Sequence, residues 1–365
     1  MERINTYEMF LEQEGIPVIR DYSIPDLMEV PLKPWARKGG LGAYINLVGA
    51  GGVIDAYLCE IPPGKALEPQ KHMFDELIYI LSGYGATSVW VKGGPKQSFE
   101  WHEGSLFAIP LNASHQHFNG RSDKPVRYIG LTKAPVFMTL FNDLEYIFNS
   151  DHVFSSRYSG EEGYFSAKGN LIKTDDKFAN PKIWESNFVP DCNTFTLVND
   201  PKRGGFSNNA HFEFAGGIMS AHISEFPGGT YMKAHWHGPG AHLLCLSGEG
   251  YELMWPLESG LTAKGVERLK IDWKKGSIFS PPDRWFHQHF STGKEPTKLL
   301  AFHGTRSLKY KPLGSDYGGV AGARKSIKHG GLQIEYADED PEIRRLFQEE
   351  LGKTGVSWKM SKFFS

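Results

Sequence analysis

The sequence contains one long internal repeat, and this repeat limits the folds that the chain can adopt. Residues 62–85 (PPGKALEPQKHMFDELIYILSGYG) match residues 227–250 (PGGTYMKAHWHGPGAHLLCLSGEG), which aligns His72 with His237 at an offset of 165 residues (237 − 72). Residues 104–110 and 115–118 match residues 276–282 and 287–290 at an offset of 172 (287 − 115). Self-similarity at this spacing indicates a duplicated structural unit. The chain is therefore expected to form two copies of one domain.

Each copy has the pattern of a small all-β domain. Short runs with β-strand character occur in the first copy at residues 53–59, 76–81, 86–91, 105–109 and 127–131, and glycines and prolines separate them. Short strands broken by frequent turns are typical of sandwiches and barrels. We expect barrels over residues 41–133 and 208–310, and a longer hairpin near residues 258–268 can hold the seven extra residues of the second copy.

The remaining segments are expected to cover or connect these barrels. Residues 1–40 form an N-terminal extension, and residues 134–207 form a linker with a helix over 136–148, where apolar residues recur at helical spacing. Residues 311–365 form a C-terminal tail whose helix, over 338–351, is predicted by Pro341 near its start and Gly352 after its end.

Composition narrows the class of protein. The 365 residues carry a net charge of −2, with 40% hydrophobic and 22% charged residues, so the chain can build a core and has no basic patch for nucleic acid. No apolar run reaches the length of a membrane span, and the first residues lack a secretory signal pattern. Three scattered cysteines (Cys59, Cys192 and Cys245) suit a reducing compartment. We therefore expect a cytoplasmic protein whose partner is a small molecule.

Histidines are the candidate functional residues. His235 and His237 lie two residues apart, which on a strand places both imidazoles on one face. His287 comes from a distant strand of the same copy and can complete a three-nitrogen site. Imidazole ligands suit iron, copper, nickel or zinc, and three ligands leave positions open for other groups. The second copy is therefore expected to bind a divalent metal.

The spacing of these residues resembles a known superfamily. Copy one reads Gly64-x7-His72-x3-Glu76-x6-Gly83 and then Gly104-x5-Pro110-x4-His115-x3-Asn119, which is similar to the two cupin motifs. Copy two repeats the pattern around His235, His237 and His287. The protein thus resembles the bicupins, and the resemblance implies two tandem jelly-roll barrels, each able to hold a metal. We also expect a homo-oligomer. Cupins include oxygenases, decarboxylases, isomerases and proteins without catalysis, so the fold alone does not fix the activity.

The two copies depart from the cupin pattern in different ways. In copy one, Gln70 stands where the first histidine is expected, which leaves His72, Glu76 and His115 as ligands of a second metal site or as remnants of one. In copy two, Ala241 stands at the glutamate position. A three-histidine set of this kind resembles the gentisate 1,2-dioxygenase type of bicupin and implies Fe(II), with Mn, Cu, Ni or Zn as alternatives.

Other residues near the expected site are weaker candidates. His289 and His117 follow the last ligand of each copy on the same strand face, and His289 can take a substrate proton. His242, beside Ala241, is a second catalytic candidate, although alternation points it to the other face. Arg268 and Arg284 can clamp a carboxylate or lie on the surface.

The leading functional hypothesis is a non-haem Fe(II) dioxygenase that cleaves the ring of a small hydroxylated aromatic acid with O₂. A neutral triad leaves the charge of the ion uncompensated, which favours an anionic chelating substrate. The alternatives are a metal-dependent lyase, isomerase or decarboxylase of a small polar acid, a copper flavonol-type dioxygenase, and a metal-stabilised binding bicupin without turnover.

Overall fold

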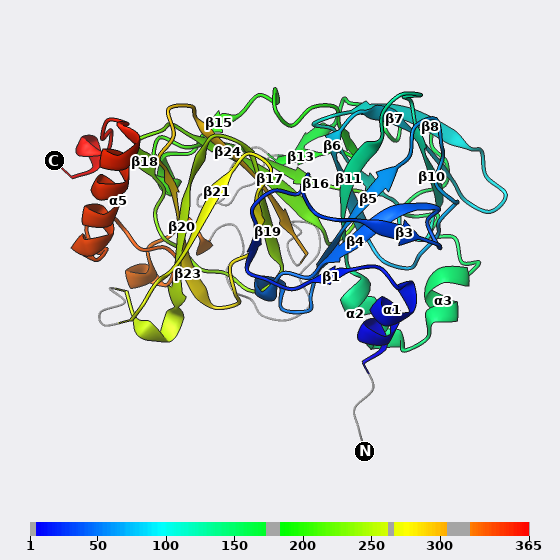
Figure 1. Ribbon diagram of the computed structural model, residues 1–365, viewed down its shortest axis with the longest axis horizontal. Coiled ribbons are helices and arrows are strands. Elements are labelled where there is room, and N and C mark those ends of the chain that lie inside the picture. The colour runs from blue at the N-terminus through cyan, green and yellow to red at the C-terminus, as the bar shows by residue number, and fades with distance from the viewer. Residues whose placement is uncertain (1–4, 173–182, 262–265, 305–321, 365) are drawn as a thin grey trace, which may run out of the picture.

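Two β-barrels lie side by side along the long axis of the molecule (Figure 1). The computed structural model describes residues 5–172, 183–261, 266–304 and 322–364. Barrel one is built mainly from β4 to β11 and barrel two from β16 to β24. The predicted all-β fold with two tandem barrels is therefore confirmed. The expected boundary between barrel two and the tail, at residues 310–311, lies outside the described residues.

Barrel one consists of a large and a small sheet. The large sheet has the order β1-β4-β5-β11-β6-β9-β14, with β3 paired to β4, and the small sheet has the order β10-β7-β8. Its strands are β1 (Val18–Ile19), β3 (Lys33–Trp35), β4 (Gly40–Ile45), β5 (Asp55–Ile61), β6 (Glu76–Ser82), β7 (Tyr84–Trp90), β8 (Gln97–His102), β9 (Leu106–Ile109), β10 (Ser114–Asn119), β11 (Val126–Thr132) and β14 (Phe188–Val189).

Barrel two repeats this arrangement. Its large sheet has the order β12-β13-β16-β17-β24-β19-β22-β2, with β15 paired to β16, and its small sheet has the order β18-β23-β20-β21. Its strands are β2 (Ser23–Ile24), β12 (Asn170–Ile172), β13 (Ile183–Glu185), β15 (Val198–Asn199), β16 (Asn208–Glu213), β17 (Ser220–Phe226), β18 (Thr230–Tyr231), β19 (Ala241–Ser247), β20 (Glu249–Pro256), β21 (Leu269–Lys274), β22 (Ile278–Phe279), β23 (Trp285–Ser291) and β24 (Thr297–His303).

The barrels exchange edge strands. β2, from the N-terminal extension, pairs with β22 of barrel two, whereas β14, from the linker, pairs with β9 of barrel one. Each barrel is thus completed by a segment that precedes the other barrel in the sequence, and the two strands lie 165 residues apart (188 − 23), as the repeated motifs do.

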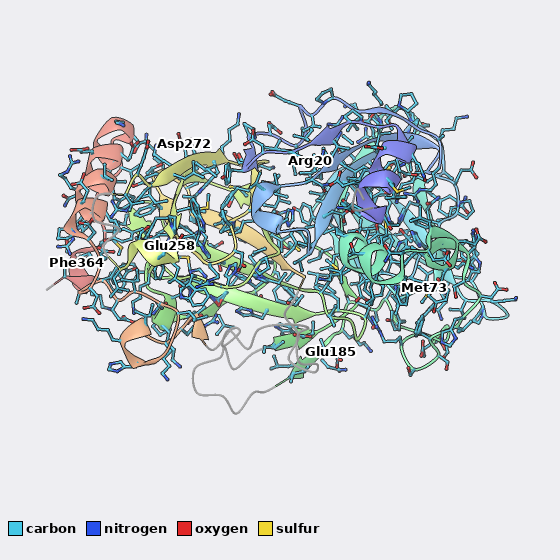
Figure 2. All side chains as sticks on the ribbon, turned by 90° about the horizontal axis from the view of Figure 1, so that it is seen from below. Arg20, Met73, Glu185, Glu258, Asp272 and Phe364 are labelled. Atoms are coloured by element: carbon cyan, nitrogen blue, oxygen red, sulfur yellow. The ribbon has the colours of Figure 1, made fainter. Side chains whose placement is uncertain are left out.

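Within the described part of the chain, four α-helices lie at the two ends of the molecule. Helices α1 (Thr6–Glu14), α2 (Ala134–Phe141) and α3 (Leu144–Asn149) group beside barrel one, and α5 (Pro341–Thr354) lies at the far end of barrel two (Figure 1). Figure 2 shows the same two ends, with Met73 near the first group and Phe364 near α5. Among the described residues, no helix is long and apolar enough to cross a membrane.

Two helix predictions need correction. The single helix expected over 136–148 is broken, because Asn142 adopts a left-handed conformation (φ 50°) that ends α2, and Asp143 then caps α3. The C-terminal helix does not end before Gly352 but continues to Thr354, where Gly355 provides the left-handed cap (φ 69°). A glycine in the last turn was mistaken for the cap that follows three residues later.

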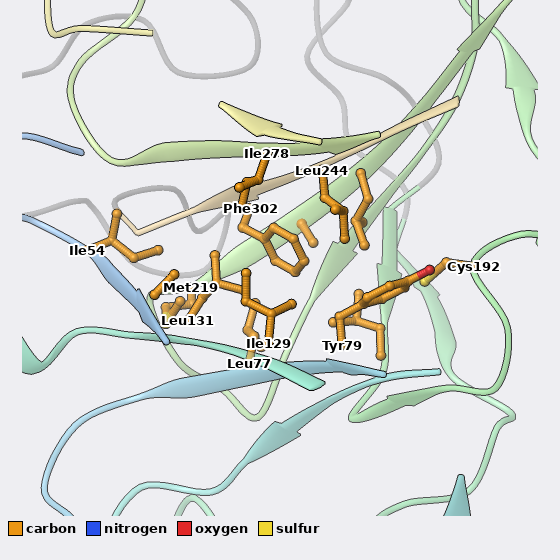
Figure 3. Close-up of a cluster of buried hydrophobic side chains, with 14 of the residues drawn as sticks. Ile54, Leu77, Tyr79, Ile129, Leu131, Cys192, Met219, Leu244, Ile278 and Phe302 are labelled. Carbon is orange, nitrogen blue, oxygen red and sulfur yellow. The ribbon is translucent and has the colours of Figure 1, made fainter. Parts of the chain in front are cut away.

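A shared hydrophobic core joins the barrels. Leu77, Ile129 and Leu131 of barrel one face Leu244 and Phe302 of barrel two, and all are nearly fully buried (Figure 3). Each such side chain contributes roughly 1.5–3 kcal/mol on burial. Because the outer faces of the two large sheets are used for this contact, the interior of each barrel is left to the residues on the opposite face.

Candidate metal centres

Barrel one brings three ligand-type side chains together. The ligand atoms of His72, Glu76 and His115 all lie within 4.8 Å of one another, and the three residues are buried. His72 Nε2 lies 3.1 Å from Glu76 Oε2, and His115 Nε2 lies 3.7 Å from the same oxygen. Glu76 starts β6 and His115 lies on β10, whereas His72 lies in the loop before β6.

The hydrogen bonds of these histidines leave an acceptor-rich centre. Nδ1 of His72 and Nδ1 of His115 face the backbone oxygens of Phe74 (2.9 Å) and Ala113 (3.3 Å), to which each can only donate. Nε2 of each ring then faces the Glu76 carboxylate, and Nε2 of His72 forms a hydrogen bond with it. Nε2 of His115 is buried without a hydrogen-bond partner among the described residues. Two imidazoles and a carboxylate in this arrangement fit a divalent cation.

A buried lysine stabilises the ionised carboxylate of barrel one. Lys38 Nζ donates to the Tyr57 hydroxyl at 2.9 Å, and that hydroxyl donates to Glu76 Oε1. Burial alone would raise the pKa of Glu76, but Lys38 and the two histidines hold it well below its usual range. The carboxylate is therefore ionised. The three residues of its site are almost fully buried, and the Phe74 ring stacks on His72 with centroids 4.0 Å apart.

Gln70 does not join this group. Its amide nitrogen donates to the backbone oxygens of Arg37, Glu68 and Pro69, and its Oε1 accepts from the Arg37 guanidinium. All of these contacts are made with atoms outside the histidine–carboxylate cluster.

Barrel two brings four histidines together. Ring centroids lie 4.2 Å apart for His235 and His287, 4.6 Å for His237 and His287, and 5.6 Å for His235 and His237. The ligand nitrogens of His235, His287 and His289 all lie within 4.8 Å of one another. His287 and His289 lie on β23 as expected. His235 and His237 are not on a regular strand but in the loop before β19, where an isolated bridge to His287 fixes His235.

Hydrogen bonds orient these rings differently. His237 Nδ1 faces the Gly238 oxygen at 2.8 Å and His287 Nδ1 faces the Trp285 oxygen at 3.2 Å, so each neutral ring that donates this hydrogen bond has its lone pair on Nε2. His235 differs, because Arg203 Nη2 donates to its Nδ1 at 2.8 Å. Burial, Arg203 and the neighbouring imidazoles hold the pKa of His235 well below its usual range, so the neutral ring carries its hydrogen on Nε2.

His289 pairs with a carboxyl group that the sequence analysis missed. Its Nδ1 lies 2.6 Å from Oε2 of Glu252, which is on the neighbouring strand β20. Burial raises the pKa of Glu252 well above its usual range and lowers that of His289 to about 3, so both groups favour their neutral forms. The equivalent pair in barrel one is His117 with Thr87, 2.7 Å apart.

The other predicted site residues lie elsewhere. His242 points away from the histidine cluster, on the face of β19 that carries Leu244 toward barrel one. Both of its ring nitrogens lack a hydrogen-bond partner among the described residues, and burial lowers its pKa to about 3. Arg268 forms an ion pair with Asp340 (2.7 Å), and Arg284 is exposed in the turn before β23.

A cavity adjoins the histidines of barrel two. The space open to the centres of water molecules is about 40 Å³, which corresponds to roughly three waters. The walls are mainly imidazoles and two arginines, and include His211, His222, His303, Arg203 and Arg324.

Residues at the corresponding strand positions explain why barrel one is filled. Tyr44 pairs with Tyr57 on β4 and β5, as His211 pairs with His222 on β16 and β17. Those two tyrosines are buried and pack edge-on against the Trp35 ring, with centroids 5.3 Å away. Barrel two has smaller rings at these positions.

The repeat contains an earlier signal that sequence reasoning missed. Residues 37–40 (Arg-Lys-Gly-Gly) match residues 202–205 (Lys-Arg-Gly-Gly) at the same offset of 165 (203 − 38). This alignment places Lys38 of barrel one against Arg203 of barrel two. Both are buried, with exposed fractions of 3% and 5%. Each copy therefore holds a buried cation beside its histidines.

The comparisons with known proteins agree with the fold. No family model matches the sequence, and no curated protein matches it. A mutant of oxalate decarboxylase from Bacillus subtilis aligns with a TM-score of 0.50 and 13% identity, over 82% of this chain and 81% of that one. A structure on the substrate binding mode of oxalate decarboxylase gives 0.50 and 12%, over 82% and 81%. A third, on proton-coupled electron transfer in that enzyme, gives 0.50 and 12%, over 78% of both chains. At this identity, the likeness shows the bicupin fold.

Proposed function

We propose that this bicupin is a metal-dependent enzyme whose reaction site is the cavity of barrel two, and that it acts on a small carboxylic acid. The observation that carries this proposal is the cavity itself, because it lies beside four convergent histidines and has cationic walls. Structural metal sites are closed, whereas catalytic sites keep positions open for substrate. Barrel one fits the first description and barrel two the second.

Within barrel two, His237 and His287 would hold the ion through Nε2, with His235 as the third ligand. His289 lies close enough to His235 and His287 to be the alternative third ligand. When bound, a divalent ion supplies a Lewis acid that polarises a carboxylate or carbonyl oxygen. The chain itself supplies the positive charge of Arg203, which favours an anionic substrate, and a small enclosed volume that keeps most water out.

The volume of the cavity favours a short carboxylic acid as the substrate. Space for roughly three waters suits an acid of two or three carbon atoms better than a substituted aromatic ring. The structural neighbours are oxalate decarboxylases by their titles, and the lyase alternative thus has more support than ring cleavage. We therefore propose cleavage of a carbon–carbon bond without net consumption of O₂, as in a decarboxylase.

The test is to load the chain separately with Mn(II), Fe(II), Zn(II), Cu(II) and Ni(II) and to supply oxalate and related short acids. The proposal expects release of CO₂ without matching O₂ uptake with at least one metal. Parallel assays with gentisate, salicylates and catechols measure O₂ uptake and loss of aromatic absorbance. Oxygen uptake with one of these would restore the dioxygenase hypothesis, and inactivity of every form would favour a binding bicupin.

A further inference from the structure

Arg203 is a buried cation without a carboxylate partner. Its Nη1 donates to the Ala323 oxygen (2.9 Å) and to Gln333 Oε1 (2.8 Å), and its Nη2 donates to His235 Nδ1 (2.8 Å). All three acceptors are uncharged. Within the described part of the chain, no carboxylate oxygen lies within ion-pair distance of this guanidinium. A buried charge is costly unless it is paired.

The acidic groups nearest to Arg203 have other partners. Asp200 Oδ2 lies 2.7 Å from Arg324 Nε and also accepts from the Asn209 amide at 3.1 Å. Glu252 directs Oε2 to His289. Both carboxyl groups favour the charged form of Arg203 through space, but neither forms an ion pair with it.

Barrel one shows which group Arg203 lacks in barrel two. There the corresponding cation, Lys38, has the Glu76 carboxylate beside it, linked through the Tyr57 hydroxyl. Glu76 pairs with Thr132 across the sheet, as Ala241 pairs with His303 in barrel two. Replacement of a glutamate by Ala241 removes the carboxylate, and the cavity lined by Ala241, His222 and His303 is open at that position.

We propose that Arg203 anchors a carboxylate ligand in the cavity of barrel two, in the place that the Glu76 carboxylate fills in barrel one. The inference rests on the proposed function in that the natural ligand is taken to be the acid substrate. His222 and His303 line the same space, and a hydrogen bond joins His222 Nδ1 to His303 Nε2, 3.0 Å apart.

The contact with His235 links this ligand to the metal. While Arg203 donates to Nδ1 of His235, the neutral ring carries its hydrogen on Nε2 and cannot bind an ion through that atom. If a carboxylate draws Arg203 Nη2 away from Nδ1 of His235, the hydrogen of His235 can move to Nδ1, and Nε2 can then bind the ion. Binding of the carboxylate and of the metal should therefore strengthen each other by the same factor.

Formate is the probe for this site, because it is the smallest carboxylate. Binding is measured as the formate-dependent rise in melting temperature and by calorimetry on the full chain, with and without metal, and chloride controls for ionic strength. Arg203→Gln should weaken formate binding at least about tenfold, as expected for loss of a charge-assisted contact, and Arg203→Lys should restore part of it. Arg127→Gln is the matched control, since Arg127 forms its ion pair with Glu60 in barrel one (2.8 Å).

The Ala241→Glu variant provides the complementary test. Its own carboxylate should occupy the site, so the protein should respond to formate no more than Arg203→Gln does. Unchanged formate affinity in Arg203→Gln overturns the proposal, as does a normal response in a folded Ala241→Glu protein. Metal content is measured in the same samples. An unaltered protein that binds no metal or shows no turnover would count against the proposed function. The inference about Arg203 is decided separately, by whether formate binding to the metal-free protein depends on Arg203.

Discussion

The two barrels share a fold and differ in how they balance a buried positive charge. Barrel one pairs Lys38 with its own Glu76, and Tyr44 and Tyr57 occupy the interior. Barrel two keeps the cation as Arg203 but has Ala241 in place of the glutamate. The two copies thus have similar sites, and barrel two has Ala241 and smaller rings where barrel one has Glu76 and two tyrosines. The same fold can hold a closed centre and an open one.

The largest effect is expected from removing a histidine of the open centre. His237→Ala should abolish detectable turnover and lower bound metal, because an Nε2 ligand is lost, while the fold survives. His72→Ala is the matched change in barrel one, and it should leave turnover within about threefold of the unaltered protein. Metal analysis and CO₂ release are measured on both variants. Turnover that survives in His237→Ala but disappears in His72→Ala would reverse the roles of the two barrels.

The next effect concerns the stability of barrel one. Glu76→Ala leaves Lys38 buried without its carboxylate, and breaking a buried charge pair costs about 3–5 kcal/mol. The free energy of unfolding, measured by urea denaturation, should fall by roughly this amount, and added formate should recover part of it. Glu76→Gln keeps the size of the side chain, so it measures the effect of the lost charge without the effect of lost packing. A loss below about 1 kcal/mol in Glu76→Ala would show that Lys38 does not depend on this carboxylate.

A smaller effect is expected from Asp55, at the start of β5, which accepts hydrogen bonds from Tyr7 and Thr132. Burial raises the pKa of its carboxyl from 3.8 to about 6. The folded state then binds more protons than the unfolded state between these values, so the contribution of Asp55 to stability falls as the pH rises from about 4 to about 6. The residue of barrel two that corresponds to Asp55 is Ser220, which carries no carboxyl group.

The measurement is the free energy of unfolding as a function of pH for the unaltered protein and for Asp55→Asn. The amide cannot ionise, so the part of the slope that comes from Asp55 should disappear in the variant. Identical slopes for the two proteins would mean that the pKa of Asp55 is the same in the folded and the unfolded state.

Much of the fold could be predicted from the sequence, because the repeat and the glycine-bounded strands determine the barrels. β5, β6, β9 and β11 begin and end within about two residues of the predicted runs. The exchanged edge strands were not predicted. β2 and β14 are two residues long, and their pairing with distant strands cannot be read from a linear pattern. They do occupy matching positions of the repeat, because Ile24-Pro25-Asp26 and Val189-Pro190-Asp191 align at the offset of 165 (189 − 24).

The site could be predicted less completely. The spacing identified the histidines that converge in each barrel, since motif positions fall on facing strands. Glu252 was missed because its function depends on cross-strand pairing with His289, which a linear pattern does not show. Arg203 was missed because it precedes the barrel, although the matched Arg-Lys-Gly-Gly and Lys-Arg-Gly-Gly segments could have revealed it.

The central claim is that barrel one carries its own carboxylate, whereas barrel two takes a carboxylate from its ligand. The most direct test is a crystal structure of the metal-loaded protein soaked in formate. We predict a formate between Arg203 and Ala241 in barrel two and none beside Glu76 in barrel one. Formate beside Glu76, or a barrel-two cavity that holds only water while metal is bound there, would contradict this account.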